Sequence, residues 1–173
     1  MEGLPDLVLL KIAEYLSPAE CVRLSLTCKR FLGLLPQYVR FLGEDFKITG
    51  PHTGHWTPEF YFDGPDLKGK VKRFRASVEW KDQGWGNRKG QLIVKLMRRD
   101  SGQNMVIAEK TNIFGIAGHD WANSTCVFVT HPVVKLAEPG DFYRFERNAG
   151  GGGGHSLFAR KFTVLLEFLS NKL

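Results

Sequence analysis

The sequence predicts an α+β multidomain protein, with a three-helix module at the N-terminus followed by an all-β antiparallel, jelly-roll-like sandwich. Apolar residues recur at helical spacing near the N-terminus, glycine and proline interrupt the chain between 36 and 69, and apolar and polar residues alternate from Val71 onward. We therefore expect a helical module at 1–45, a packed Pro/Gly-rich connector at 46–69 and a target-binding sandwich at 70–173.

Two stretches of the helical module have the signals of helix starts. Pro5 suits a first helical position, where no backbone N–H is needed, and Leu9, Ile12 and Leu16 recur on one helical face. The run Ser17–Glu20 reads SPAE, a capping box with proline at the first helical position. The module holds more leucines than three short helices can bury among themselves, so we expect part of its surface to meet another protein.

Residues 4–16 read LPDLVLLKIAEYL, and residues 23–31 read RLSLTCKRF. These runs resemble the F-box, whose usual pattern is LPxxLLxxIxxYL, a short turn and an RLSLVCKRF-like run. Two positions depart from it: Leu7, where many members carry an acidic residue, and Thr27, where valine is common. The alternative is that these leucines simply close a helical cap over the second domain.

The resemblance implies a module that docks on the Skp-family adaptor of a cullin-RING ubiquitin ligase. The positions that match the family pattern, and that would contact the adaptor, are Leu4, Pro5, Leu9, Ile12, Leu16, Leu24, Cys28 and Phe31.

The second part of the chain contains short runs of β-branched and aromatic residues bounded by Gly, Pro, Asn or Asp, which is typical of an antiparallel sandwich. In the last run, Arg160 shares an otherwise apolar face with Phe158 and Phe162, so it needs a partner or marks the rim. The expected strands start at Val71 and continue with Gln91–Arg98, Val106–Lys110, Ser124–Thr130, Val133–Leu136, Phe142–Arg147 and Leu157–Leu169.

The loop 80–90 has the composition of a recognition loop, because glycines allow tight turns, tryptophans offer flat apolar contact and polar side chains orient a ligand. Its run DQGW resembles one in β-sandwich domains of uncharacterised fungal and protist proteins. A second unusual loop, Gly150–Gly154, precedes His155. For the loop 80–90, the alternative to a recognition loop is a structural hairpin loop, in which Trp85 packs into the end of the sandwich and Asp82 hydrogen-bonds to its own backbone. The predicted target-binding residues are Trp80, Asp82, Gln83, Trp85, Asn87, Arg88 and His155.

The formal net charge of +6 is unevenly distributed. Residues 1–45 carry five Lys/Arg against six Asp/Glu, whereas residues 68–99 carry eleven basic residues and two acids, Glu79 and Asp82. A basic region of this density favours anionic partners, although it can also be a solvated strand face. Nucleic acid is the less favoured partner.

The sequence offers little support for catalysis or for a cofactor. The three cysteines form no CxxC pair, there is no GxSxG elbow, and His52 and His55 have no third metal ligand. No apolar run approaches the roughly 18 residues of a membrane span. We expect a non-enzymatic, cytoplasmic or nuclear substrate-recognition subunit of an SCF-type ubiquitin ligase, without cofactor or metal, whose sandwich binds a target protein or glycoprotein. The alternative is a lectin-like or acidic-ligand-binding sandwich with a helical cap.

Overall fold

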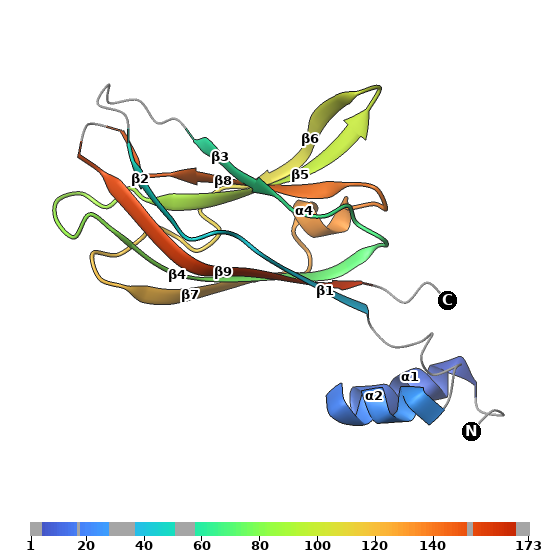
Figure 1. Ribbon diagram of the computed structural model, residues 1–173. Coiled ribbons are helices and arrows are strands. Elements are labelled where there is room, and N and C mark those ends of the chain that lie inside the picture. Colours follow the sequence, from blue (N-terminus) through green and yellow to red (C-terminus); the bar gives the residue numbers. More distant parts are fainter. Residues whose placement is uncertain (1–4, 17, 28–36, 51–57, 152–153, 169–173) are drawn as a thin grey trace.

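The computed structural model describes residues 5–16, 18–27, 37–50, 58–151 and 154–168. Helices α1 (Asp6–Glu14) and α2 (Pro18–Thr27) lie outside a β-sandwich, as Figure 1 shows. The expected third helix of the N-terminal module is not among the elements of the described residues, and residues 28–36 lie outside them. The sandwich consists of β1 (Gln37–Leu42), β2 (Phe46–Thr49), β3 (Glu59–Asp63), β4 (Val71–Asp82), β5 (Gln91–Asp100), β6 (Gln103–Lys110), β7 (Ala122–Phe128), β8 (Phe142–Asn148) and β9 (Ser156–Phe168).

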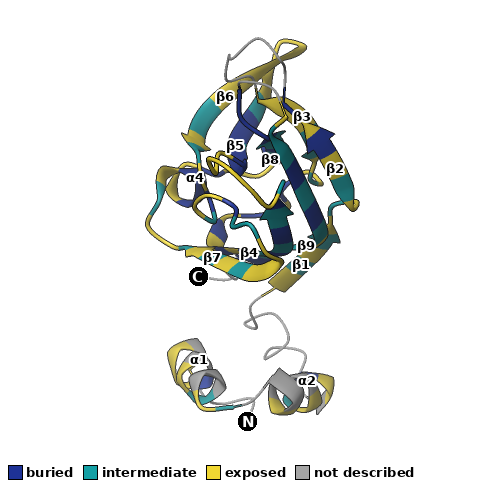
Figure 2. Cartoon of the chain, turned by 90° about the vertical axis from the view of Figure 1, so that its left-hand side faces the viewer, coloured by how far each residue is buried: buried dark blue, intermediate teal, exposed yellow. Residues whose placement is uncertain are grey.

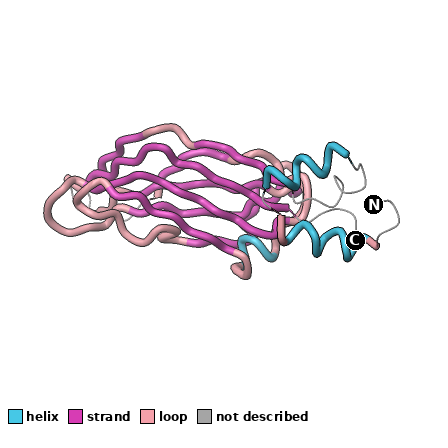
Figure 3. Tube along the Cα trace, turned by 90° about the horizontal axis from the view of Figure 1, so that it is seen from below, coloured by secondary structure: helices cyan, strands magenta, loops and turns pink. Residues whose placement is uncertain are grey.

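The strands form two antiparallel sheets, which confirms the predicted sandwich class. The first sheet has the order β1-β9-β4-β7, and β2 also pairs with β9. The second sheet has the order β3-β8-β5-β6. Figure 3 shows the strands of both sheets running side by side along the length of the molecule. Strand β9 is central to the first sheet, because β1 pairs with its C-terminal part, β2 with its N-terminal part and β4 with both.

Aromatic side chains fill the space between the sheets. Phe74 and Phe162 from the first sheet are fully buried against Tyr143 and Phe145 from the second. The ring of Phe62 stacks on that of Phe145 at a centroid distance of 4.7 Å. In Figure 2 the buried segments of the strands are dark blue. Because burying one such side chain contributes about 1.5 to 3 kcal/mol, this cluster is a main source of the stability of the sandwich.

The sandwich begins earlier in the chain than the sequence predicts. The sequence predicts residues 37–42 to belong to the helical module, yet as β1 they pair with β9 at every position from Gln37 to Leu42. The expected connector 46–69 contains β2 and β3, which pair with β9 and β8. The alternation of Val39 and Phe41, which pack on the core, covers too few residues to be recognised as a strand beside the leucine-rich helices.

The segment Val133–Leu136 was expected to be a strand, and this prediction is wrong. It lies in the short helix α4 (Pro132–Lys135). Pro132 occupies the first turn, and the His131 ring accepts a hydrogen bond from the Val133 N–H at 3.3 Å. Val133 and Val134 are buried in the core. Their β-branched side chains favour a strand, but the local cap and the packing determine the helix.

A β-bulge in β9 changes which of its side chains face the core. The backbone of Lys161 has a φ of 55°, and the pairing of β9 with β4 shifts register between Ser77 and Glu79. The Lys161 N–H donates to Asp45 Oδ1 at 3.0 Å. Phe162 therefore faces the core. The expectation that Phe158 and Arg160 share its face is wrong, because the bulge places them on the opposite face.

Candidate functional site

Two neighbouring loops form one end of the sandwich. The β4–β5 loop spans residues 83–90, and the β8–β9 loop spans residues 149–155, of which 152 and 153 lie outside the described residues. We call this region the loop end. Five of the seven predicted target-binding residues lie in these loops, and the other two, Trp80 and Asp82, lie at the adjoining end of β4.

Asp82, the last residue of β4, holds the start of the first loop. Its carboxylate is fully buried and accepts hydrogen bonds from the Gly84 N–H and from the His119 Nδ1, both at 2.8 Å. The Asp82 N–H donates to the Gly118 carbonyl at 2.8 Å. Asp82 thus binds the backbone of its own loop at Gly84, as the alternative expectation for this residue proposed, and also ties the loop to the segment before β7. Its side chain is fully buried and offers no surface to a target.

Gln83 connects the two loops. Its amide nitrogen donates to the carbonyls of Trp85 at 2.6 Å and Asn87 at 3.2 Å and lies 3.2 Å from His155 Nδ1. Its amide oxygen accepts a hydrogen bond from the Ser156 N–H at 3.2 Å. Since both polar atoms of this side chain have partners in the loops or at the start of β9, Gln83 and His155 shape the loop end.

The second loop requires glycine at the point where it meets the first. Gly150 has a φ of 96°, and a Cβ atom there would lie 2.3 Å from the Cβ of Lys89. Lys89 in turn donates from Nζ to the Gly151 carbonyl at 3.0 Å. Gly50, at the end of β2, approaches the Gly150 carbonyl so closely that a Cβ would lie 1.9 Å from its oxygen. A larger residue at Gly150 would push the two loops apart, and one at Gly50 would push the second loop away from the end of β2.

The loop end exposes only part of the predicted set. Trp85 is 66% exposed, and Asn87 and Arg88 are also exposed. Trp80 is 2% exposed and lies in the core, where its Nε1 donates to Ser124 Oγ at 2.9 Å. The structure therefore divides the predicted residues into a supporting group and a surface group. The surface group is Trp85, Asn87 and Arg88, and the supporting group is Trp80, Asp82, Gln83 and His155.

Of the eight predicted adaptor-binding residues, three lie in α1 and α2 and two flank α1. Leu9 is buried, Ile12, Leu16 and Leu24 are half-buried, and Pro5 is exposed, while Leu4, Cys28 and Phe31 lie outside the described residues.

The most exposed apolar side chains in and next to the helices are not in the predicted set. Leu7 is 73% exposed, Leu26 is 81% exposed and Tyr15 is 82% exposed. The surplus of leucines in the sequence signalled such residues without identifying them, because the inward and outward faces of so short a helix pair differ little in composition.

The described residues contain no group of three His, Cys, Asp or Glu side chains that could hold a metal ion. His52 and His55 lie outside the described part of the chain. None of the helices that the structure describes is long and apolar enough to cross a membrane. Cys126, in β7, is half-buried, and this burial raises the pKa of its thiol to about 11, so it is a poor nucleophile at neutral pH.

The chain is similar in fold to structures from infectious bursal disease virus. It matches the structure of the Gx strain with a TM-score of 0.57 and 9% identity, over 80% of this chain and 33% of that chain. It matches the VP2 subviral particle with a TM-score of 0.54 and 8% identity, over 79% of this chain and 34% of that chain. The chain spans about a third of these viral chains, and at this identity the likeness shows the fold alone.

No curated protein matches the chain in sequence. The resemblance of Asp82–Trp85 to other sandwich domains stays a prediction. Residues 1–36, which include α1 and α2, match the F-box-like family model, and this match supports an F-box protein.

Proposed function

We propose that the protein is a substrate-recognition subunit of an SCF-type ubiquitin ligase, without catalytic chemistry of its own. Its helical module binds the Skp-family adaptor, and its sandwich binds the target protein. The observation that carries this proposal is the F-box-like match over residues 1–36. The two helices in that segment expose large apolar side chains, as expected of a surface that a partner covers.

The size of the helices supports the need for a partner. Helix α1 has nine residues and α2 has ten. Isolated helices shorter than about 12 residues are marginal in water, so their stability depends on packing. Burial of Leu7 and Leu26 against an adaptor would each contribute about 1.5 to 3 kcal/mol. The same contacts would stabilise the pair and bind the adaptor.

The proposed mechanism is positional. A subunit that holds both the adaptor and a target raises the effective concentration of target lysines near the ubiquitin-loaded enzyme. On the target side, the exposed Trp85 offers an aromatic contact of the kind that dominates interfaces, and Asn87 and Arg88 beside it offer polar contacts. Such a subunit would act in the cytoplasm or the nucleus.

Co-purification with a Skp-family adaptor tests the proposal. The single variants Leu7→Asp and Leu26→Asp place a charge on highly exposed positions of α1 and α2, so they should leave the helices folded. Each should abolish or strongly reduce adaptor binding, because the carboxylate would be desolvated in the interface. Val106→Asp is the matched control, since Val106 is an exposed apolar residue of β6, away from the helices.

The control variant should co-purify with the adaptor at the wild-type yield. Wild-type yields for both Leu7→Asp and Leu26→Asp would contradict an interface formed by these helices. A wild-type chain that fails to bind any Skp-family adaptor would contradict the proposed function itself.

A further inference from the structure

The outward face of the first sheet carries a row of side chains that the proposed function does not yet use. The register sets Arg40 of β1 opposite Leu165 of β9, and Leu165 opposite Arg75 of β4. Arg75 in turn lies opposite Val127 of β7. Directly opposed residues point to the same side of a sheet, so two arginines flank an aliphatic side chain, about 10 Å apart at the backbone.

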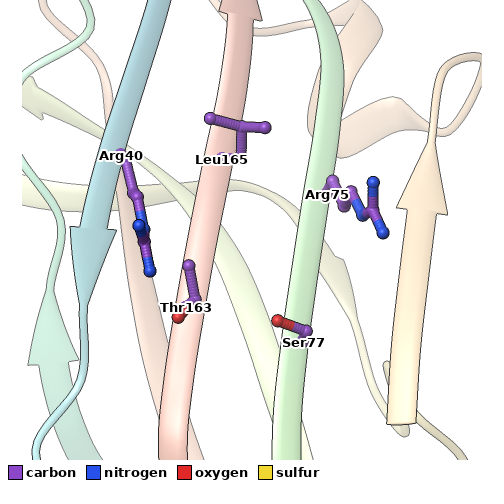
Figure 4. Close-up of a pocket in the computed structure, with 5 residues that line it drawn as sticks. All are labelled: Arg40, Arg75, Ser77, Thr163 and Leu165. Carbon is purple, nitrogen blue, oxygen red and sulfur yellow. The ribbon is translucent and has the colours of Figure 1, made fainter.

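These arginines border a shallow hollow of about 260 Å³. Figure 4 shows Arg40 and Arg75 on the strands to either side of β9, with Thr163 on β9 and Ser77 on β4 farther along the strands and the Arg75 side chain pointing away from β9. Both arginines are exposed, and the Ser77 hydroxyl can donate a further hydrogen bond. The Thr163 hydroxyl donates to the Lys161 carbonyl at 3.4 Å and offers acceptor capacity. The residues that line the hollow are Arg40, Arg75, Ser77, Thr163 and Leu165.

The two arginines keep their charges available. The outward-facing acids of β4 and β9 have other partners: Glu79 binds Arg160 at 2.5 Å and Lys161 at 2.9 Å. Glu167 binds Lys72 at 2.8 Å and Arg73 at 3.4 Å. No carboxylate of the described residues pairs with Arg40 or Arg75.

A second hollow of about 320 Å³ continues the first, because Arg75 and Leu165 line both. Its character is more aliphatic, since Val127 is 52% exposed and Val129 is also exposed. We call the two hollows together the outer groove. The residues that line the second hollow are Tyr38, Arg73, Arg75, Val127, Val129, Leu165 and Glu167.

Positive charge continues along the same face beyond the groove. Lys47 of β2 and Lys81 of β4 lie over the ring of Phe158, with Nζ at 5.2 Å and 5.3 Å from its centroid. Arg75 and Lys81 lie six positions apart on β4, which is about 20 Å of strand. This length corresponds to an extended peptide of about seven residues.

We propose that the outer groove binds an extended acidic segment of the target, with carboxylates on Arg40 and Arg75 and an aliphatic side chain on Leu165 and Val127. Charges spread along a strand suit a run of carboxylates better than one isolated anion. Exposed valines favour a peptide over single-stranded nucleic acid, which binds through aromatic stacking platforms. That the segment belongs to a target rests on the proposed function; the binding itself requires no adaptor.

Fluorescence anisotropy with the full chain tests the groove. The probe is a fluorescein-labelled peptide of one valine followed by six glutamates, at low salt. Arg40→Gln/Arg75→Gln should weaken its binding by about tenfold, since two charge pairs of this kind together contribute roughly one to two kcal/mol. Val127→Asp should weaken binding by repulsion. Lys68→Gln/Lys135→Gln is the matched control, because it removes the same net charge from exposed residues outside the groove.

Unchanged binding by the control and loss in both groove variants would support the proposal, with circular dichroism showing that all variants are folded. Equal loss in the control would overturn it, because it would show a general charge effect. Tighter binding of a phosphoserine-containing counterpart or of single-stranded RNA would overturn the ligand class, and so would a probe that does not bind the wild type. Adaptor co-purification of Arg40→Gln/Arg75→Gln should equal that of the wild type, so the groove and the proposed function can fail separately.

Discussion

Trp80 and Trp85 lie five positions apart, yet their surroundings are opposite. Trp80 is buried between the sheets, and Trp85 is exposed at the loop end. Trp80→Ala should lower the free energy of unfolding by about 3 to 5 kcal/mol, because it removes a large buried side chain. Trp85→Ala should change it by no more than about 0.5 kcal/mol. Urea unfolding of the two variants measures both values, and similar losses would contradict the assigned burial.

The ion pairs of Glu79 give stability a defined pH dependence. Hydrogen bonds from Arg160 and Lys161 lower the pKa of Glu79 from 4.5 to about 2. A carboxyl whose pKa is lower in the folded state stabilises the protein above its unfolded pKa. That contribution is lost as the pH falls toward about 2.

Glu79→Gln should therefore reduce the slope of unfolding free energy against pH between pH 4.5 and about 2, and thermal unfolding across this range measures it. Glu59→Gln is the control, because the ion pair that Glu59 makes within the described part of the chain is a long contact of 3.8 Å to Arg147. Identical slopes for wild type and Glu79→Gln would count against these ion pairs.

At the residue scale, the sequence indicated that the loop 80–90 is structurally constrained, but it could not tell which of its side chains are exposed and which support the loop. The glycines, tryptophans and polar residues of 80–90 indicated a constrained loop. Whether Asp82 faces a ligand or the protein depends on His119, which is distant in sequence and reaches it only through the fold. Exposure of Trp85 likewise depends on how the second loop packs.

At the scale of elements, the bulge in β9 shows how one residue changes the outcome of a periodicity argument. Strict alternation placed Phe158 and Arg160 with Phe162, but the extra residue at Lys161 exchanges the two faces. The left-handed backbone of Lys161 is one that glycine usually adopts, and lysine gives no sign of it. The bulge thus lay beyond prediction, while the strand itself was predicted.

The hydrogen bond from the Lys161 N–H to Asp45 should stabilise this bulge. Asp45→Ala should lower the free energy of unfolding by about 1 kcal/mol, because the N–H loses its acceptor. Asp45→Asn keeps an oxygen acceptor and should recover most of this loss. Chemical denaturation of both variants measures the effect; an Asn variant as unstable as the Ala variant would indicate that charge, and not the hydrogen bond, matters at Asp45.

At the scale of the whole molecule, the structure and the sequence analysis disagree on where the sandwich begins. A fragment 37–173 should fold with an unfolding midpoint close to that of the sandwich in the full chain, because it keeps every described strand. A fragment 70–173 lacks β1, β2 and β3 and should be unfolded or aggregated, since one edge of β9 and one edge of β8 lose the strands that cover them. Circular dichroism and gel filtration distinguish these outcomes. A folded, monomeric 70–173 would support the boundary at residue 70 that the sequence predicts.

The sandwich class could be predicted because alternation is a local signal repeated in several strands. The pairing of strands could not, because it joins segments far apart in the chain, as Gln37 with Phe168 does. For the same reason the outer groove was invisible in the sequence: Arg40, Arg75 and Leu165 belong to three strands. Only the excess of basic residues in 68–99 pointed toward a positive surface.

The central position of β9 has a consequence for how the protein is made. Strand β9 is the last of the described strands along the chain, and β1, β2 and β4 all pair with it. A nascent chain on the ribosome therefore holds three strands of the first sheet without their shared neighbour until residues 156–168 have left the exit tunnel. The first sheet closes only after β9 has emerged, and until then β1 and β2, which pair with β9 among the described strands, are natural clients for chaperones.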